Sequence, residues 1–352
     1  MKKRVRVTVI DVAKKAGVSQ TTVSRVLNDH PQIKESTKTK VLQAIDELGF
    51  SPNQIARSMV MKKTRTIGWI VGEIDNPYYA ESAKVIMGKA RQINYDVIIT
   101  DTENNYDYFE KSIKTMVDKG VDGILISTLH HKESMVNELF ESGFPIVYFN
   151  RKPDRDGIHS VTVDNEKGIY LAVQHLVELG HENIAFVSYP SRFPTLHERY
   201  LGYLDALKKF GLRIDETLVH NREFSHENIF KFVSDTLSRE DRPTSFITSI
   251  DQLAISVMDA VSKSGLSASK KVSIIGFGDI DIASHPYIGL TTVSSQKREM
   301  AQIALEKLIS LIERKLDPQS PVQVILEPEL IIRKTTASAR ILKRKKGGVN
   351  AY

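Results

Sequence analysis

Residues 8–28 read TVIDVAKKAGVSQTTVSRVLN, a stretch that predicts two short amphipathic helices joined by a tight turn. Thr8 and Asp11 have the spacing of a capping box, and apolar residues then recur at helical intervals as far as Gly17. Ser19 is a suitable N-cap for the second helix, which has an apolar stripe of its own. Short helices separated in this way by Gly-Val-Ser are typical of the helix-turn-helix motif.

A third amphipathic helix follows the pair and completes a small core. It is expected to run from about Ser36 to Leu48 and to end at Gly49. The polar residues of the second helix that point away from this core are Gln20, Thr21, Ser24 and Arg25. Gln and Arg can bond bidentately to adenine and guanine edges in the major groove, and the start of a recognition helix is where side chains reach bases. We therefore predict an all-α DNA-binding domain over residues 1–50.

The positive charge of the chain is concentrated in this first segment. The whole chain has a formal net charge of +6, from 49 Lys and Arg against 43 Asp and Glu. Residues 1–65 contain 14 Lys and Arg against 5 Asp and Glu, a net of +9, which leaves 35 against 38, a net of −3, for residues 66–352. A basic head on a nearly neutral body suits a polyanion held at one end of the molecule. Since charge alone would also suit RNA or an anionic membrane, the motif decides for DNA.

The order and spacing of several segments resemble the LacI/GalR family of transcriptional regulators. The matching segments are Thr8–Ala13, Ala16–Ser19, Thr22–Asn28 and Gly49–Ser58. By this resemblance Gln20, Thr21 and Arg25 would contact bases. The residues expected mainly to position the head on phosphates are Ser19, Thr22, Ser24 and Asn28, and the expected DNA interface also includes Thr8.

Residues 51–65 are expected to form a hinge helix and a linker. Asn53 is a suitable cap for a helix that ends at Met59, but a helix this short rarely forms alone in water. The resemblance implies that it folds when two copies meet in the minor groove, where Met59 would wedge between the central base pairs. The hinge residues predicted to contact DNA are Asn53, Ala56, Arg57 and Met59. The alternative, that residues 51–64 are only a linker, stays open.

After Arg65 the pattern changes to short apolar runs that alternate with helical stretches. The expected strands are 66–71, 96–100, 123–127, 145–149, 183–188, 244–248 and 272–276. Uniformly apolar strands between helices predict parallel sheets that are covered on both faces. Two such series predict an α/β body of two doubly wound lobes, with ligands held at the carboxyl ends of the strands. The resemblance implies the same architecture, that of periplasmic sugar-binding proteins.

We assign residues 66–340 to an effector-binding and dimerisation domain. The resemblance implies that the chain crosses between the lobes near Asp164, near Ser294 and near Pro321. The expected lobes are therefore 66–164 with 295–321, and 165–294 with 322–340. Residues 341–352 would form a basic tail that has no leucine heptad, so a dimer is favoured over a tetramer.

Polar and aromatic residues near the expected strand ends are candidate effector-binding residues. The resemblance implies that Tyr78 and Tyr79 are the candidates to stack on the ligand and that Arg199 clamps it. The other candidates are Thr128, Asn150, Thr195, His197, Phe224, Asp251 and Asp279.

The chain departs from sugar-responsive members of the family that it resembles at two of these candidates. The acid after Gly276-Phe277 is displaced by one residue to Asp279, and Ile250 stands where an Asn commonly precedes Asp251. A missing or displaced polar group changes ligand discrimination strongly. The expected effector is a sugar or sugar derivative, and the alternative is a co-repressor such as a nucleobase or another non-sugar metabolite.

Several other classes of protein are excluded by the residues present. With 0 Cys the chain forms neither a disulfide nor a thiolate metal site, and a reducing cytoplasm is expected. We expect no signal peptide, and no apolar run approaches the roughly 18 residues of a membrane-spanning helix. No phosphate-binding glycine loop or nucleophile motif indicates an enzyme, and His130-His131 has no third metal ligand beside it, so no cofactor is expected. We therefore expect a cytoplasmic repressor that binds a pseudo-palindromic operator as a homodimer and responds to a small molecule.

Overall fold

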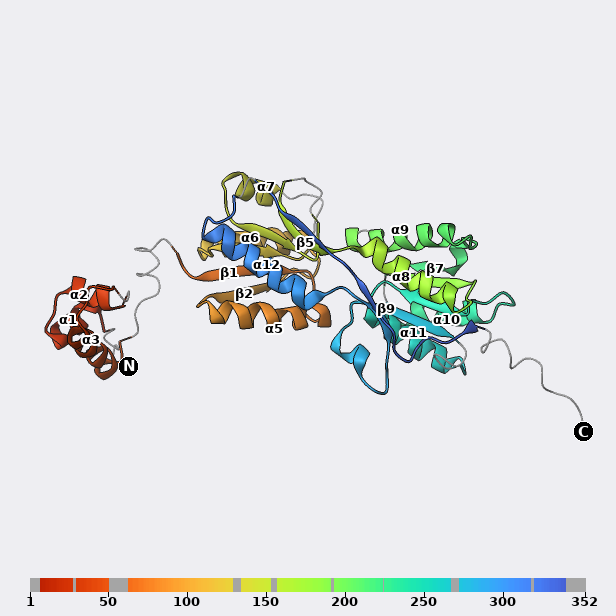
Figure 1. Cartoon of the computed structure of the whole chain (residues 1–352), viewed down its shortest axis with the longest axis horizontal. Helices are drawn as coiled ribbons and strands as arrows, with labels where there is room; N and C mark the ends of the chain where they lie inside the picture. The colour runs from red at the N-terminus through yellow and green to blue at the C-terminus, as the bar shows by residue number, and fades with distance from the viewer. Residues whose placement is uncertain are drawn as a thin grey trace, which may run out of the picture. The chain divides into compact units, whose positions relative to one another are not determined.

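The chain divides into two compact units, Met1–Thr64 and Arg65–Tyr352. The computed structural model describes residues 7–27, 30–50, 63–128, 134–152, 157–190, 193–223, 225–266, 272–317 and 320–339. Figure 1 shows a helical first unit and a second unit in which two α/β lobes follow each other. The predicted fold class, an all-α head and a doubly wound α/β body, is confirmed.

The first unit contains three described helices, α1 (Val9–Ala16), α2 (Gln20–Leu27) and α3 (Glu35–Leu48). The backbone amide and the hydroxyl of Thr8 donate to Asp11 Oδ2, at 2.8 and 2.7 Å, and hold the start of α1. These hydrogen bonds keep the pKa of Asp11 below its ordinary value. Gly17 and Gly49 end α1 and α3 with φ of 67° and 59°, the left-handed conformation that glycine adopts most easily.

A core of small apolar side chains joins these helices. Val12 of α1, Val23 of α2 and Val41 of α3 are each 0% exposed, and Phe50 packs against the same cluster. Burying one such side chain contributes about 1.5–3 kcal/mol, so a few contacts decide the stability of this unit.

The first lobe of the second unit contains a parallel six-stranded sheet in the order β11-β5-β4-β3-β1-β2. Its strands are β1 (Thr66–Val71), β2 (Asp96–Asp101), β3 (Gly123–Ile126), β4 (Ile146–Phe149), β5 (His159–Val163) and β11 (Gln323–Leu326). Its helices are α5 (Pro77–Gln92), α6 (Tyr106–Asp118), α7 (Ser134–Glu141) and α12 (Lys297–Ile312). β3, β4 and β5 are buried along their whole length, as expected for parallel strands covered on both faces.

The second lobe contains another six-stranded sheet, in the order β12-β10-β9-β8-β6-β7. Its strands are β6 (Ile184–Ser188), β7 (Val219–Asn221), β8 (Ser245–Thr248), β9 (Ser273–Phe277), β10 (Thr291–Ser294) and β12 (Glu329–Ile331), and β12 alone is antiparallel to its neighbour. Its helices are α8 (Asn165–Glu178), α9 (Pro194–Lys209), α10 (His226–Leu237) and α11 (Asp251–Lys263), with the short 3-10 helices η1 (Glu216–Leu218) and η2 (Asp281–Ser284).

The chain passes from one lobe to the other at three places. β5 leads into α8 through Asp164, and β10 leads back to α12 through Gln296, which has φ 52°. β11 still pairs in parallel with β5, while β12 pairs in the second sheet, so the third passage lies between Leu326 and Glu329. The boundary expected near Pro321 is therefore too early. The alternating, half-exposed side chains of β11 do not reveal from the sequence which sheet the strand joins.

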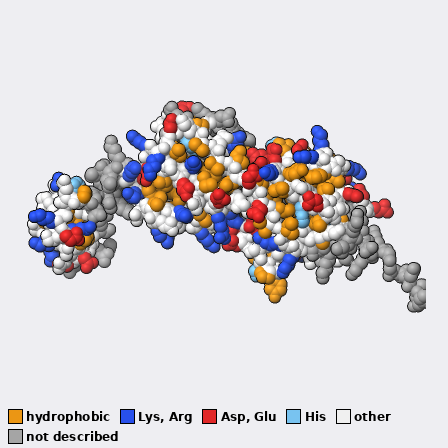
Figure 2. Space-filling view, in the orientation of Figure 1, with side chains coloured by type: hydrophobic (Ala, Val, Ile, Leu, Met, Phe, Trp, Pro, Cys, Tyr) orange, Lys and Arg blue, Asp and Glu red, His pale blue; other side chains and the backbone are white. Residues whose placement is uncertain are grey.

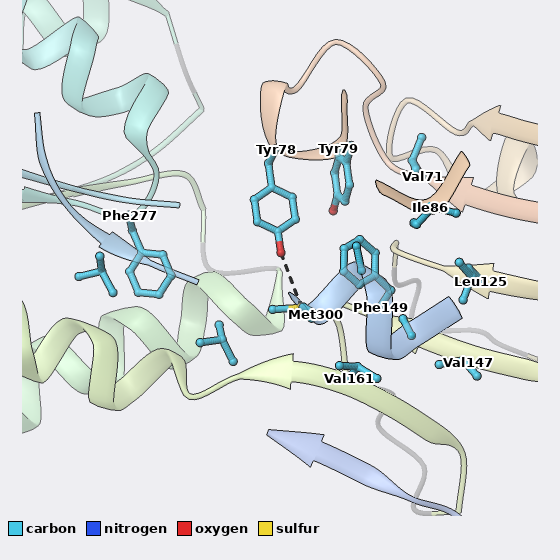
Figure 3. Packing of buried hydrophobic residues seen from close by; sticks show 14 of the residues in the cluster. Val71, Tyr78, Tyr79, Ile86, Leu125, Val147, Phe149, Val161, Phe277 and Met300 are labelled. Atoms are coloured by element: carbon cyan, nitrogen blue, oxygen red, sulfur yellow. Dashed lines mark hydrogen bonds between the residues drawn. The ribbon is translucent and has the colours of Figure 1, made fainter. Parts of the chain in front are cut away.

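α12 returns to the first lobe and packs against α5 and the central strands. Figure 3 shows Met300 of α12 below Tyr78 of α5 and beside Phe149 at the end of β4. The loop between β9 and β10, which contains η2, projects from the second lobe in Figure 1, and its tip is apolar in Figure 2. Tyr287 in this loop is 94% exposed. In the described part of the chain no helix is long and apolar enough to cross a membrane.

Candidate functional site

One face of α2 carries the residues that we expect to touch bases. Val23 and Val26 are 0% and 5% exposed and turn the opposite face of the helix into the core. The residues that this arrangement leaves exposed are Gln20, Thr21, Ser24 and Arg25. The prediction that these side chains contact DNA is consistent with their exposure and stays a prediction.

Ser19 and Thr22 hold the start of α2. Ser19 Oγ accepts a hydrogen bond from the Thr22 amide at 3.1 Å and lies 2.9 Å from Thr22 Oγ1. This helix start has the amides and the positive dipole end that bind phosphates elsewhere. Thr8 is exposed, but its hydroxyl already donates to Asp11, so that proton is not available to a phosphate oxygen. The other predicted DNA contacts lie outside the described residues, as does the predicted hinge helix: Asn28, Asn53, Ala56, Arg57 and Met59.

A cleft of about 150 Å³ lies between the two lobes of the second unit. Loops at the carboxyl ends of β1, β2, β4, β6, β7, β8 and β9 form its walls, which is where doubly wound sheets bind ligands. The predicted effector residues that line it are Tyr78, Tyr79, Asn150, Thr195 and Arg199. Because ligand clefts usually measure roughly 300–1,000 Å³, this one suits a small molecule.

Tyr78 and Tyr79 enter the cleft from the start of α5. Asn76 Oδ1 accepts the Tyr78 amide at 3.0 Å, and the two tyrosine rings meet edge to face at 5.5 Å. Tyr79 donates its hydroxyl to Ser127 O at 2.9 Å. Tyr78 donates its hydroxyl to Met300 Sδ at 3.7 Å, the contact that is dashed in Figure 3. Both hydroxyls are therefore engaged within the protein, so it is the carbon surface of the rings that a ligand would contact. Burial also keeps the pKa of Tyr78 far above its ordinary value.

Asn150 and Arg151 enter the cleft from the end of β4. Asn150 has φ 60°, a left-handed conformation that Asn tolerates better than most residues. Its Oδ1 and Arg151 Nε are both buried without a hydrogen-bond partner among the described residues. Arg151 Nη1 donates to Thr195 Oγ1 and so links the wall of the first lobe to the wall of the second.

Arg199 lies on α9 at the opposite wall and is 5% exposed. Its Nε donates to Asn165 Oδ1 at 2.8 Å and its Nη1 donates to Ser249 O at 2.6 Å. The guanidinium also lies 3.7 Å from the centre of the Phe277 ring, a cation–π contact. Burial lowers the pKa of Arg199 to about 10, so the group is still charged at neutral pH. Arg199 is therefore a rigidly held cation at the cleft.

Two of the predicted effector residues, Thr128 and His197, are not among the residues that line the cleft. Thr128, which follows β3, is 1% exposed, and its hydroxyl has no hydrogen-bond partner in the part of the chain that the structure describes. His197 is exposed on α9; it is two residues after Thr195, so it lies on the other side of the helix, and it is not among the residues that line the cleft. Phe224 lies outside the described residues.

Asp251 stabilises a neighbouring loop instead of facing the cleft. Its Oδ2 accepts the Ile280 amide at 2.9 Å, and its Oδ1 accepts the Thr292 hydroxyl at 2.5 Å. It is 1% exposed, and this burial raises the pKa of Asp251 to about 6. The carboxylate thus joins the start of α11 to the segment after β9.

Asp279 is not among the residues that line the cleft, and its backbone is left-handed, with φ 49°. Its carboxylate pairs with Arg333 Nη2 at 2.6 Å, and its carbonyl accepts from Lys297 Nζ. The acid that is displaced by one residue in the sequence is thus paired within the second lobe.

The cleft also contains residues that we did not predict. The most polar of these are Glu73, Asn76, Asn104, Arg151, Glu223 and Gln252. Most of them follow strands that were predicted, and Arg151 is adjacent to the predicted Asn150. The expectation that ligands bind at the carboxyl ends of the strands thus identified the loops of the cleft. It did not identify which side chain of each loop faces the cleft.

Comparisons with known proteins agree with both units. The model of bacterial regulatory proteins of the lacI family matches residues 8–53, and the model of periplasmic binding proteins and the sugar-binding domain of the LacI family matches residues 64–325. Catabolite control protein A of Priestia megaterium is 33% identical over 319 residues, which cover 90% of this chain and 96% of that protein.

Two solved structures are similar over most of the chain. A Lac repressor dimer bound to operator and the anti-inducer ONPF has a TM-score of 0.83 and 26% identity, covering 94% of this chain and 99% of the other. A complex of the transcriptional regulator CelR with cellobiose has a TM-score of 0.69 and 27% identity, covering 94% of this chain and 100% of the other.

A three-helix head with an exposed polar helix face, joined to a two-lobed domain with a cleft, defines a ligand-responsive DNA-binding regulator. The chain belongs to the LacI family of bacterial regulatory proteins. It is a DNA-binding transcriptional repressor with an effector-binding domain.

Proposed function

We propose that the protein acts in the cytoplasm as a homodimer on a pseudo-palindromic operator, and that a small molecule in the cleft controls operator affinity. Residues 1–50 read the DNA, residues 51–65 join the units as hinge helix and linker, and residues 66–340 bind the ligand and dimerise. The observation that carries the proposal is the exposed polar face of α2, which includes Gln20 and Arg25. One head offers few base contacts, and symmetric pairing of two heads doubles them.

Two observations support the dimer. The Lac repressor structure that is similar over 94% of this chain is a dimer bound to operator. Tyr287, 94% exposed in the projecting β9–β10 loop, offers an aromatic contact for a second copy, and exposed apolar surface often marks an interface.

The ligand would act through the angle between the lobes. Glu81 of α5 accepts the amide of Asp281 from the second lobe at 2.7 Å and lies 3.1 Å from Lys297 Nζ, so a polar contact bridges the lobes. A ligand that prefers one lobe angle shifts the population by its differential affinity. A coupling of about 1–3 kcal/mol would change operator affinity about 5- to 150-fold.

Base reading is tested with a duplex that the full chain selects from a random library. Arg25→Ala and Gln20→Ala are each expected to weaken binding to the selected duplex by about 1–3 kcal/mol, with little change for a scrambled duplex. Lys40→Ala removes an exposed charge from α3 and is the matched control, because a lost phosphate attraction lowers both affinities by the same factor. Equal losses on the two duplexes for Arg25→Ala and Gln20→Ala would contradict base reading by α2.

Sensing is tested by measuring the operator Kd in the presence of neutral sugars, sugar phosphates, sugar acids and nucleobases. A compound that weakens operator binding is an inducer, and one that strengthens it is a co-repressor. If a compound binds the protein by calorimetry but leaves the operator Kd unchanged, the proposed coupling is wrong.

A further inference from the structure

We propose that the cleft binds a small hydroxylated ligand with one anionic group, and that Arg151 and Arg199 together hold that group. This inference rests on the proposed function, since it names the class of ligand for the same cleft. The anionic group is a phosphate or a carboxylate, both of which match the fork of a guanidinium.

The two arginines approach the cleft from different lobes. Arg151 follows β4 of the first lobe, and Arg199 lies on α9 of the second. Among the described residues neither forms an ion pair with a carboxylate; their hydrogen bonds go to Thr195 Oγ1, Asn165 Oδ1 and Ser249 O. Burial is the main cause that lowers the pKa of Arg199; the positive charge of Arg151 acts in the same direction, while Tyr78, Glu198 and Asp251 act against it. A buried charge without a counterion is costly, so an anion between the two groups would stabilise both.

Unsatisfied polar atoms lie beside the two arginines. Arg151 Nε, a donor, and Asn150 Oδ1, an acceptor, are buried without hydrogen-bond partners among the described residues. A ligand that presents an anionic oxygen to the donor and a hydroxyl to the acceptor would satisfy both atoms. Buried polar groups in native proteins are nearly always satisfied, and a bound ligand is one way to do so.

Two acidic residues, Glu73 and Glu223, also line the cleft. Glu73 and Glu223 are exposed, and both raise the pKa of Tyr189, whereas Arg199 and Arg151 act on Tyr78. Glu73 Oε1 accepts from Asn104 Nδ2 at 2.7 Å, and carboxylate and amide groups of this kind are suitable partners for ligand hydroxyls. Water screens the exposed acids more than it screens Arg199, which is 5% exposed, so we expect the arginines to determine the preferred charge of the ligand.

Arg199 is fixed in place before a ligand arrives. Asn165 accepts from Arg199 Nε with Oδ1 and donates from Nδ2 to Glu198 Oε2 at 2.7 Å, which sets the orientation of its amide. The Phe277 ring then supports the guanidinium plane. A donor that is already oriented loses little conformational entropy on binding.

The test uses the full chain without DNA and measures Kd by calorimetry for glucose 6-phosphate, glucose 1-phosphate, gluconate, glucuronate, glucose and inorganic phosphate. At least one anionic sugar is expected to bind about tenfold or more tightly than glucose, and more tightly than inorganic phosphate. The two phosphates and the two carboxylates distinguish the source of the negative charge. Raising the salt concentration should weaken the binding of the anionic sugar and leave the binding of glucose unchanged.

Variants assign the effect to the cleft. Arg151→Gln is expected to weaken binding of the preferred anion about 10- to 100-fold, so that the anion no longer binds more tightly than glucose. Arg151→Lys keeps the positive charge but loses the forked donor geometry of the guanidinium. Its affinity for the anion is expected to lie between those of the wild type and Arg151→Gln. Lys152→Gln removes an exposed charge one residue away and serves as the matched control, with no change beyond about twofold. Far-UV circular dichroism and thermal unfolding verify that each variant is folded.

Three results would overturn the inference: glucose binding as tightly as every anion, an unchanged Kd of the anion for Arg151→Gln and Arg151→Lys, or no binding of any anion in the panel. These results are distinct from a failure of the proposed function. An anion that binds through Arg151 but leaves the operator Kd unchanged contradicts the sensing proposal and leaves the ligand class standing.

Discussion

Replacing Lys297 by Met is expected to destabilise the protein strongly, because it leaves a buried carboxylate without its cation. The side chains of Glu81 and Lys297 are 8% and 7% exposed, and Glu81 Oε2 lies 3.1 Å from Lys297 Nζ. Within the described residues Glu81 Oε2 accepts no aligned hydrogen bond, so the attraction between the two charges accounts for this contact. Lys297 Nζ also donates to the carbonyls of Gly278, at 3.2 Å, and Asp279.

The magnitude follows from this geometry. Two unit charges 3.1 Å apart attract by about 5 kcal/mol at an effective dielectric constant of about 20. Desolvating the two ions costs several kcal/mol each, so the intact pair contributes little compared with an apolar pair of the same size. Removing only the cation keeps the cost of burying Glu81 and loses the attraction. We therefore expect Lys297→Met to lower the free energy of unfolding by about 3–5 kcal/mol.

The double variant Glu81→Gln with Lys297→Met separates this explanation from simple loss of packing. It removes both charges, and we expect it to be more stable than Lys297→Met by about 2 kcal/mol or more. Arg298→Met is the control, because its ion pair with Asp281 is 69% and 58% exposed and is expected to contribute less than about 1 kcal/mol.

The assay is urea unfolding of the full chain, followed by the fluorescence of Trp69, the 1 Trp of the sequence, which is buried in β1 beneath α5 and α12. The reasoning is refuted if the double variant is no more stable than Lys297→Met. It is also refuted if Lys297→Met lowers the free energy of unfolding no more than Arg298→Met does.

Two further predictions concern Asp251 and the contact between α8 and α9. Burial raises the pKa of Asp251 to about 6, so the folded state holds this proton more tightly than the unfolded state, and the stabilisation is present near pH 4 and lost as the pH rises through about 6. Urea titrations should therefore show the difference in unfolding free energy between wild type and Asp251→Asn shifting by about 2 kcal/mol from pH 4 to pH 7; a constant difference contradicts the assignment. A Cβ on Gly202 would lie 2.7 Å from the backbone of Glu166, so Gly202→Ala should cost about 1–3 kcal/mol and loosen the Arg199 bond to Asn165. Gly88→Ala in α5 is the control: a Cβ on Gly88 has no neighbour within 4 Å, so this substitution should stabilise the protein by about 0.5–1 kcal/mol. If both variants shift the melting temperature equally, helix propensity alone explains the effect of Gly202→Ala.

Local signals in the sequence were sufficient for the head. Thr8 and Asp11 form the predicted capping interaction, and Gly17 ends α1 in the left-handed conformation. The apolar stripe of α2 is buried and its polar face is exposed, as its spacing predicts. These features depend on residues a few positions apart, so a single short stretch specifies them.

The predicted strands are those that contain an apolar run, and length did not decide the outcome, because β3 and β4 have only four residues each. The expected ranges around β1, β3, β4 and β9 agree with the structure to within one or two residues. Strands that were not predicted are short or rich in Ser, Thr and His, such as His159–Val163, Val219–Asn221 and Thr291–Ser294. Their burial comes from the neighbouring strands and not from their own composition.

By itself, then, the sequence determined the class of protein, the two α/β lobes and the loops that surround the cleft, because helix caps, apolar periods and strand ends are local properties. The tertiary structure alone decided which side chains face a ligand. Asp251 and Asp279 stand at strand ends like Asn150, yet contacts with Thr292 and with Arg333, 41 and 54 residues along the chain, hold them elsewhere. Arg151 meets Thr195, 44 residues away, only because the two lobes come together. Partners so distant in sequence are joined by packing, which no local pattern reports.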